Sequence, residues 1–488
     1  MKLEDLTIKS IQEGLKKKTF CALEITERYL ERIGKTDKKI NAYITVCESQ
    51  AKKAAKKIDQ LISDNQPLPP LAGVPMAVKD MFSTCGIRTT AASKILGNYI
   101  PPYDATCIAK LKDAGAIILG KTNHDEFAHG SSGENSAYGE TKNPYDLERV
   151  PGGSSSGSAA VVASQEALFA TGTDTGSSIR LPAAFCNVVG LKPTYGRVSR
   201  YGVIAMASST DCPGPITRTV EDLACVLEVM AGGDPKDATC PNVPVPNYGK
   251  FLGGEIKGLK IGIPKEFFSE GINKKVLELT YKAISKLEDL GAKIVEVSLP
   301  HTEYGLAVYY IIVPSEISAN LARYDGVRFG AGREKFGDEV KRRIMIGTYV
   351  LSSGYYDQYY NNACRVRELI KDDFAKVFQK VDVLAAPVSP TPPWKLGEKV
   401  DDPVKMYLSD IFMVTANLAG VPSISVPCGF VDDPSTSHSA ASSGRVGSGQ
   451  SLPVGLQIMA NHFEEEKILK VADYYQKATN WHKILPEV

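Results

Sequence analysis

Two segments decide how this sequence is interpreted: residues 151–160 read PGGSSSGSAA, and residues 172–182 read GTDTGSSIRLP. Both segments are rich in glycine and serine, and an apolar stretch separates them. Glycine allows a backbone to turn its N–H groups toward a ligand, and serine becomes a nucleophile when a base lies within hydrogen-bonding distance. The two segments therefore predict either an anion-binding loop or a serine-based catalytic site.

Two common motifs fit parts of these segments poorly. Residues 151–160 could hold a phosphate, but they lack the G-K-[ST] ending of a P-loop. Residues 153–157 also fit the G-x-S-x-G nucleophile elbow, which would make Ser155 the nucleophile. An elbow needs a hydrophobic strand directly before it, whereas the preceding residues, KNPYDLERVPGG, are polar and turn-like, and no later histidine has a catalytic setting.

The rest of the chain predicts an α/β fold. From residue 71 onward, short apolar runs alternate with segments of helical pattern, such as residues 105–113 and 276–290. This alternation is typical of a sheet with helices on its faces. The apolar runs are GVPMAVKD, AIILGKTN, ALFATGTDT, LKIGIP, VDVLAAPV, SISVPCGF and VGLQIMA.

The domain organisation is expected to be simple. Residues 1–65 carry apolar positions at helical spacing, which predicts a helical N-terminal layer. No repeat of fixed period and no linker divides the chain, so we expect one domain over residues 1–488, with the catalytic core at residues 71–215. Residues 431–450 are rich in serine and glycine and lie between two apparent strands, which predicts a flexible surface loop.

Charge and composition exclude several classes of protein. The 57 Lys and Arg residues nearly balance the 56 Asp and Glu residues, so no strong field attracts nucleic acid or an anionic membrane. Ten cysteines without a C-x-x-C pair favour reduced thiols, and six histidines without metal-ligand spacing argue against a metal site. No signal peptide or membrane-spanning run is evident, so we expect a cytoplasmic protein with no membrane partner.

The two opening segments together resemble the signature of the amidase signature family of serine amidases. The resemblance implies the amidase signature fold, a central mixed β-sheet covered by helices on both faces, and hydrolysis of a carboxamide. It also implies a catalytic unit of Ser178 as nucleophile, Ser154 as proton bridge and Lys79, within GVPMAVKD, as base. Burial would disfavour the ammonium form of Lys79 and leave an amine that accepts a proton near neutral pH.

The loop around the nucleophile is assigned by the same resemblance. Four backbone N–H groups would hold the oxyanion of the reaction. They belong to Thr175, Gly176, Ser177 and Ser178. Ser177 departs from the family, whose members commonly carry glycine there, but it keeps a small side chain and a usable N–H, so we expect an active enzyme. Asp174 and Arg180 are expected to hold the loop rather than to act on the substrate.

Residues 190–211 and 342–360 extend the resemblance to one group within the family, the A subunits of tRNA-dependent glutamine amidotransferases, over nearly the whole chain. In that group the A subunit releases ammonia from glutamine. The B and C subunits use the ammonia to convert Glu-tRNA(Gln) or Asp-tRNA(Asn) to the amidated form, with ATP, Mg and tRNA bound by the B subunit. The resemblance therefore implies a heterotrimeric ligase of protein biosynthesis, with nucleotide binding in the complex and no cofactor in this chain.

A glutaminase must recognise the α-carboxylate and the α-ammonium of glutamine, for which a guanidinium and a carboxylate are complementary. The resemblance places these groups on Arg343 and Asp410, with Arg342 as the alternative arginine. Tyr309 matches a further substrate contact, although Tyr310 is adjacent. Residues 330–340 are shorter than is usual for the group and residues 431–450 are longer, so a stand-alone amidase acting on a small amide remains the alternative.

Overall fold

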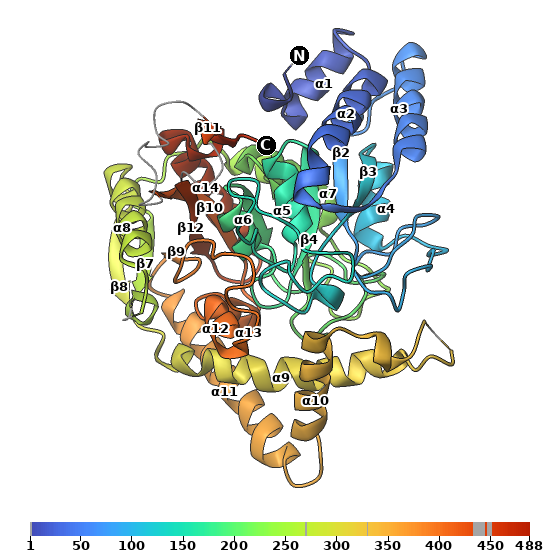
Figure 1. Ribbon diagram of the computed structural model, residues 1–488. Helices are drawn as coiled ribbons and strands as arrows, with labels where there is room; N and C mark the ends of the chain where they lie inside the picture. Colours follow the sequence, from blue (N-terminus) through green and yellow to red (C-terminus); the bar gives the residue numbers. More distant parts are fainter. Residues whose placement is uncertain (1, 269–270, 329, 433–444, 447–450) are drawn as a thin grey trace.

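An eleven-stranded mixed β-sheet forms the centre of the computed structural model, which describes residues 2–268, 271–328, 330–432, 445–446 and 451–488 (Figure 1). The strand order is β1-β3-β2-β4-β6-β5-β10-β12-β9-β7-β8. The strands are β1 (Tyr43–Val46), β2 (Pro75–Lys79), β3 (Ile117–Thr122), β4 (Phe169–Asp174), β5 (Val189–Lys192), β6 (Cys212–Thr217), β7 (Lys260–Pro264), β8 (Lys293–Val297), β9 (Val383–Pro387), β10 (Ser423–Asp432) and β12 (Ser451–Met459). Strands β11 (Arg445–Val446) and β13 (Leu485–Pro486) form a separate parallel pair.

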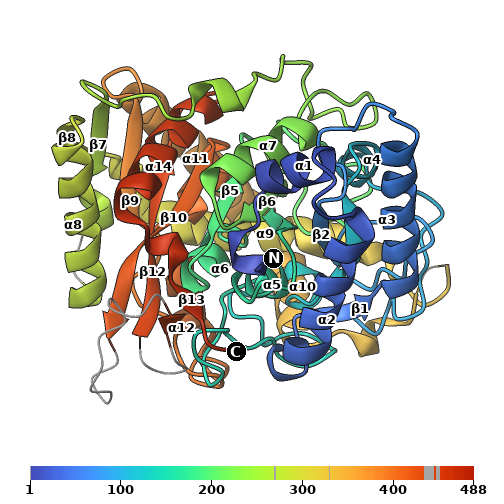
Figure 2. The same cartoon turned by 90° about the horizontal axis from the view of Figure 1, so that it is seen from above.

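Helices cover both faces of this sheet. The helices are α1 (Ile8–Lys16), α2 (Ala22–Ile40), α3 (Glu48–Ser63), α4 (Thr106–Asp113), α5 (Ser156–Ala163), α6 (Arg180–Phe185), α7 (Val220–Met230), α8 (Lys274–Asp289), α9 (Gly305–Asn320), α10 (Asp338–Val350), α11 (Asn362–Val377), α12 (Pro403–Tyr407), α13 (Val414–Ala419) and α14 (Glu465–Thr479). In Figure 2, α7 and α14 lie on one side of the central strands and α5 and α6 on the other. The predicted α/β fold with a mixed, doubly covered sheet is confirmed.

Each of the seven apolar runs contains a strand of this sheet: β2, β3, β4, β7, β9, β10 and β12. Parallel pairs join β2 to β3 and to β4, and β7 to β8 and to β9, whereas the remaining neighbours are antiparallel. The carboxyl ends of β2 and β4 therefore lie at the same edge. This edge is where ligands commonly bind in α/β sheets.

The N-terminal segment contains α1, α2 and α3, and also strand β1, which the sequence pattern did not predict. Thr7 caps α1 by accepting a hydrogen bond from the Ser10 N–H, and Asn41 ends α2 in the left-handed region. The chain then turns directly into β1, which forms the edge of the sheet and pairs antiparallel with β3. The segment is thus joined to the sheet by backbone hydrogen bonds as well as by side-chain packing.

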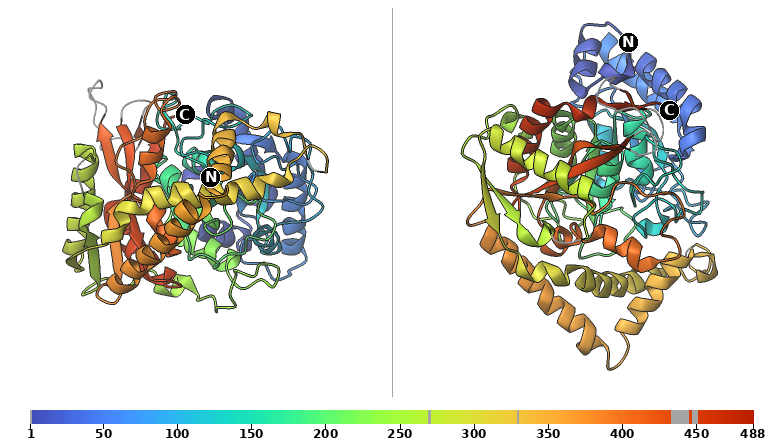
Figure 3. Two further views of the ribbon diagram at one scale, coloured as in Figure 1. Left: turned by 90° about the horizontal axis from the view of Figure 1, so that it is seen from below. Right: turned by 60° about the vertical axis from the view of Figure 1, so that its left-hand side comes forward.

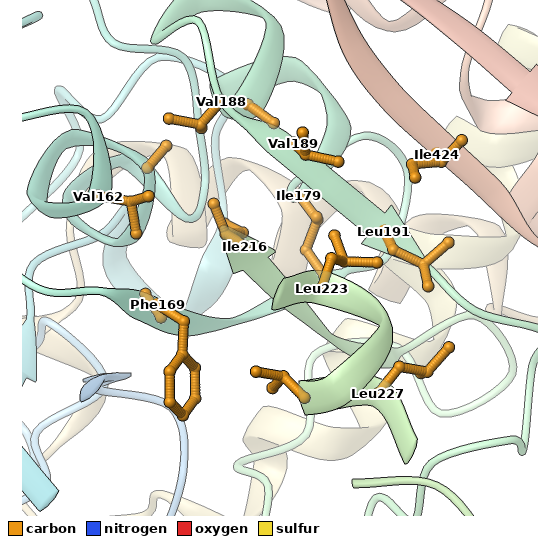
Figure 4. Close-up of a cluster of buried hydrophobic side chains, with 14 of the residues drawn as sticks. Val162, Phe169, Ile179, Val188, Val189, Leu191, Ile216, Leu223, Leu227 and Ile424 are labelled. Atoms are coloured by element: carbon orange, nitrogen blue, oxygen red, sulfur yellow. The ribbon is translucent and has the colours of Figure 1, made fainter. Parts of the chain in front are cut away.

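The core between β4, β5, β6 and α7 packs directly behind the two glycine- and serine-rich segments (Figure 4). Ile179, which follows the predicted nucleophile, is fully buried in this core together with Leu191 and Ile216. Adding a Cβ at Gly172 or Gly214 would bring it within 3.0 Å of an Ile179 side-chain atom. The backbone of β4 and β6 therefore approaches Ile179 too closely for a larger residue at these positions.

Helices α9, α10 and α11 form a layer at one end of the sheet, and α10 and α11 extend away from the body (Figure 3). The helical run Pro300–Arg323, which includes α9, is long and apolar enough by composition to cross a membrane. Helix α9 instead packs against α10, α11 and α13, and half of the apolar stretch is buried. We therefore interpret α9 as a packing helix of the folded domain.

Most of the loop predicted over residues 431–450 lies outside the described residues. Of that segment, Val431 and Asp432 complete β10, and β11 pairs with β13 near the end of the chain.

Candidate active site

Lys79 is the last residue of β2 and is fully buried. Its Nζ lies 2.7 Å from Ser154 Oγ, 3.0 Å from Ser155 Oγ and 2.8 Å from Thr173 Oγ1. No carboxylate among the described residues forms an ion pair with it. Burial without an ion pair disfavours the ammonium and lowers the Lys79 pKa to about 7, although the more distant negative charges of Asp125, Asp174 and Asp211 oppose this shift.

Ser178 lies in the loop between β4 and α6 and retains 6% exposure. Its carbonyl oxygen accepts a hydrogen bond from the Ser155 N–H at 3.0 Å, which holds the two serine-rich segments side by side. Within the described ranges, the Ser178 hydroxyl makes no hydrogen bond to another residue. The structure thus brings Lys79 and Ser154 into direct contact and places Ser178 beside their segment with a free hydroxyl.

The predicted oxyanion loop is also free of internal hydrogen bonds at its amides. In the part of the chain that the structure describes, none of the four N–H groups donates to a protein atom. They are those of Thr175, Gly176, Ser177 and Ser178. An N–H group that is not used by the protein is able to donate to a substrate oxygen.

An ion pair between Asp174 and Arg180 holds this loop at both ends. Both side chains are fully buried, and the guanidinium donates to both carboxylate oxygens, at 2.9 and 3.0 Å. Asp174 also accepts from the backbone N–H of Ile179, and Arg180 donates to the Gly176 carbonyl oxygen. Each charge is therefore compensated, and the pair fixes the loop backbone as the sequence predicted.

Asp410 lies in a short 3-10 helix, Leu408–Asp410, and its carboxylate points at the nucleophile loop. Its Oδ1 accepts from the Ser177 hydroxyl at 2.7 Å and its Oδ2 from the Ser131 hydroxyl at 2.8 Å. The positive charge of Arg343 lowers the Asp410 pKa, but burial outweighs this and the hydrogen bonds, so the net pKa is raised.

Arg343 and Arg342 point in different directions from α10. Arg343 is buried, donates from Nε to Glu339 Oε1 at 2.7 Å, and lies over the Tyr310 and Tyr407 rings. Arg342 also contacts Glu339, but its side chain is 39% exposed. The positive charge of Arg343 is among the main influences on the Asp410 pKa, which it lowers, and this favours Arg343 for the substrate side of the site.

Tyr309 lies directly against the nucleophile loop. A Cβ built on Gly176 would stand 2.7 Å from Tyr309 Oη, so the phenol and the glycine backbone are in close contact. Tyr310 instead faces Arg343 and stacks on Tyr407, with 3.9 Å between ring centroids. The two rings contact each other edge to face, with 5.0 Å between centroids, and Tyr309 is the one that also contacts the nucleophile loop at Gly176.

A cavity of about 540 Å³ opens next to this group. Its walls include Gly130 and Ser132, on either side of Ser131, together with Arg342, Glu339 and Tyr407, but the predicted catalytic residues, Arg343 and Asp410 do not line it. The size suits a small molecule, and the polar walls suit a charged one. By contrast, Ser155, the alternative elbow nucleophile, is fully buried and hydrogen-bonded to Lys79.

Three residues of the site were not predicted from the sequence. Thr173 contacts Lys79, and Ser131 contacts Asp410. Asp125 accepts from the N–H groups of Gly133 and Asn135, and burial raises its pKa to about 7. Thr173 lies within the signature and could have been found there, whereas residues 125–135 are an ordinary polar loop in sequence. Over the described residues, no cluster of three His, Cys, Asp or Glu side chains could hold a metal.

Comparison with known proteins identifies the family of this chain. The sequence matches the amidase family over residues 24–469. The A subunit of the glutamyl-tRNA(Gln) amidotransferase of Geobacter metallireducens is 53% identical over 497 residues, covering 99% of each chain. That of Carboxydothermus hydrogenoformans is 54% identical over 503 residues, covering 100% of each chain.

Solved structures give the same result. The A subunit of the glutamyl-tRNA(Gln) amidotransferase of Thermotoga maritima is 40% identical, with a TM-score of 0.82 over 100% of this chain and 99% of that one. The peptide amidase of Stenotrophomonas maltophilia is 29% identical, with a TM-score of 0.81 over 98% and 97% of the two chains. The chain therefore belongs to the amidase family, in the group formed by the A subunits of glutamyl-tRNA(Gln) amidotransferases.

Proposed function

We propose that this chain is the glutaminase subunit of a tRNA-dependent amidotransferase and hydrolyses glutamine through Ser178, Ser154 and Lys79. The observation that carries the proposal is the buried Lys79 amine, 2.7 Å from Ser154 Oγ and next to the loop that bears Ser178. A lysine with a pKa of about 7 is substantially neutral at cellular pH and is able to accept a proton.

The first half of the reaction forms an acyl-enzyme. Ser178 Oγ attacks the carboxamide carbon of glutamine and loses its proton to Ser154, which passes its own proton to Lys79. The carbonyl oxygen becomes an oxyanion and accepts hydrogen bonds from the free N–H groups of residues 175–178. When the tetrahedral intermediate collapses, the C–N bond breaks, and the proton returns from Lys79 through Ser154 to the leaving nitrogen, which departs as ammonia.

The second half regenerates the enzyme. A water molecule attacks the glutamyl ester on Ser178, and the same relay takes the proton of the water. The ester C–O bond then breaks, Ser178 recovers its proton, and glutamate leaves. One water is consumed for each glutamine, and one ammonia and one glutamate are produced.

The substrate is recognised by opposite charges. The guanidinium of Arg343 is complementary to the α-carboxylate of glutamine, and the Asp410 carboxylate is complementary to the α-ammonium. Tyr309 contributes a wall of the site beside Gly176. A stand-alone amidase acting on a neutral amide would have no use for the buried Asp410 carboxylate, which is costly to hold without a cation, whereas Arg343 is already paired with Glu339.

The released ammonia is the proposed product for partner subunits. The full-length similarity to A subunits of glutamyl-tRNA(Gln) amidotransferases supports assembly with B and C subunits in the cytoplasm. In this proposal, ATP and Mg are used on the B subunit, which also binds the Glu-tRNA(Gln) or Asp-tRNA(Asn) to be amidated. The near-neutral charge of this chain is consistent with tRNA contact through the partner.

Purification of the tagged chain from its own cells, followed by a glutaminase assay, tests this function. We expect B and C subunits in the eluate and ammonia release from glutamine. Alanine at Arg343 or Asp410 should raise the KM for glutamine strongly, and by more than alanine at Arg342, whose side chain is 39% exposed but lines the cavity. A lone homo-oligomer that hydrolyses small neutral amides equally well with or without Arg343 and Asp410 would instead indicate a stand-alone amidase.

A further inference from the structure

The Asp410 carboxylate is held by two hydroxyl groups from different parts of the chain. Ser177, in the nucleophile loop, donates to Oδ1 at 2.7 Å, and Ser131 donates to Oδ2 at 2.8 Å. All three side chains are at most 3% exposed. The carboxylate therefore has one hydroxyl on each oxygen and is fixed in orientation, and no cation among the described residues forms an ion pair with it.

Two hydroxyl donors leave part of the carboxylate available. An ionised carboxylate has about four lone-pair sites, and an ammonium group offers three N–H donors. With one site on each oxygen occupied, the remaining sites are able to receive an ammonium group. Because Ser177 is adjacent to Ser178, the same hydrogen bond also fixes the distance between this acceptor and the nucleophile.

The charges around Asp410 favour a role for the hydroxyls in keeping it ionised. Arg343 is the principal cation facing it, Lys399 interacts with it more weakly, and the negative charge of Asp174 opposes ionisation. Burial raises the Asp410 pKa, and the hydrogen bonds from Ser177 and Ser131 are the largest opposing causes. Loss of either hydroxyl would favour the protonated acid, which binds an ammonium poorly.

We propose that Ser177 is a positioning residue for substrate selection, whose hydroxyl orients the Asp410 carboxylate to receive the ammonium group of an amino-acid amide. The inference rests on the proposed function, because it takes Asp410 as the group that binds the α-ammonium of glutamine. A residue without a hydroxyl at position 177 cannot make this bond. The hydroxyl thus gives this chain an additional determinant of selectivity for amides that carry an α-ammonium.

The test compares two substrates that differ only in that ammonium group: glutamine and glutaramate, which is glutamine without its amino group. Wild type, Ser177→Ala and Ser177→Gly are assayed as full chains, purified with the subunits that accompany them. Because the Ser177 N–H belongs to the oxyanion loop, a general effect of either substitution on catalysis would lower kcat/KM for both substrates alike. The readout is therefore the ratio of kcat/KM for glutamine to that for glutaramate. We expect this ratio to fall about tenfold in both variants through a higher KM for glutamine, as is typical for loss of a hydrogen bond to a charged group.

Ser131→Ala provides a matched variant, because it removes the donor from the other carboxylate oxygen without altering the nucleophile loop. We expect the same selective rise in KM for glutamine. Equal losses on both substrates, a fall in kcat alone, or an unchanged or lower KM in the Ser177 variants would overturn the inference. If wild type released no ammonia from glutamine, the proposed function would fail, and this inference would fail with it. If wild type were active but the Ser177 variants had the same KM for glutamine as wild type, only the role of Ser177 would be refuted.

Discussion

At the scale of single residues, the reaction depends on Lys79, whose side chain is buried where its protonated ammonium form is unfavourable. Lys79 is fully buried among hydroxyl groups, and its pKa is lowered to about 7. Asp125 is the largest opposing influence, because its negative charge stabilises the ammonium form. The pKa of Asp125 is itself raised to about 7 by burial, so the two groups titrate in the same range.

This electrostatic arrangement predicts the pH dependence of the enzyme. Lys79 acts as a base only when neutral, so kcat/KM should fall about tenfold per pH unit as the pH drops below about 7. In Asp125→Asn the carboxylate charge is lost, the ammonium is less stable, and the falling limb should move to lower pH. Rate profiles of both proteins check this. If the fall in kcat/KM at low pH disappeared in Asp125→Asn, it would reflect titration of Asp125, and its assignment to Lys79 would be wrong.

Lys79→Arg separates the charge of the side chain from its ability to accept a proton. Arginine remains protonated at all working pH values, so it cannot serve as base. We expect Lys79→Arg to be as inactive as Lys79→Ala, with losses on the order of a thousandfold in kcat. A single-turnover measurement of ammonia release is sufficient, and wild-type rates in Lys79→Arg would refute base catalysis by this lysine.

The sequence predicted the residues of the signature far better than their partners. Ser154, Ser178 and Asp174 occupy a long glycine-rich register, and their loop has the expected free amides. Ser131 and Asp125 could not be found in this way, because they belong to a polar loop without a recognisable motif. Ser131 contacts Asp410, which lies 279 residues further along the chain. A pattern in sequence carries no information about such a distant contact.

At the scale of elements, the position of Arg343 depends on how closely α9 and α10 pack. Gly347 lies one helical turn after Arg343, and a Cβ built on it would stand only 1.9 Å from the Pro314 carbonyl oxygen. The contact is with backbone, so neither side is able to move aside locally. The two helices must separate if Gly347 acquires a side chain.

Gly347→Ala should therefore lower the stability and weaken glutamine binding together. We expect a loss of about 1–3 kcal/mol in the free energy of unfolding, as is typical for overpacking, and a rise in KM because Arg343 shifts. Denaturant unfolding and steady-state kinetics measure the two effects.

Gly34→Ala is the matched control for this prediction. Gly34 is an exposed position in α2 with nothing within 4 Å of a Cβ placed on it, and alanine is the better helix former. We expect Gly34→Ala to be neutral or slightly stabilising, with an unchanged KM. Equal behaviour of the two variants would show that α9 and α10 do not constrain each other as described.

The strands show why the fold was predicted only in part. Every apolar run became a strand, but β6 was missed because Pro213 and Pro215 argue against a central strand. In the structure β6 nonetheless lies between β4 and β5, with the prolines opposite Thr173 and Thr171. β1 was missed because its four residues lie between two helices and resemble their surroundings.

At the scale of the whole molecule, the site is assembled from three regions of the chain. The sheet edge at β2 and β4 supplies Lys79 and the nucleophile loop, the helical layer supplies Tyr309 and Arg343, and the segment before α13 supplies Asp410. Ser177 joins the first region to the third through its hydrogen bond to Asp410. Recognition of the substrate and attack on it are thereby linked in one rigid arrangement.

The central claim is that Ser178 attacks the carboxamide of glutamine, and the rate of ammonia release by Ser178→Ala tests it most directly. The assay uses the full chain with its accompanying subunits, at saturating glutamine and about pH 8, where Lys79 is neutral. We predict that ammonia release falls by on the order of a thousandfold or more, while the variant unfolds at the same denaturant concentration as wild type. Ammonia release by Ser178→Ala at the wild-type rate would contradict the account.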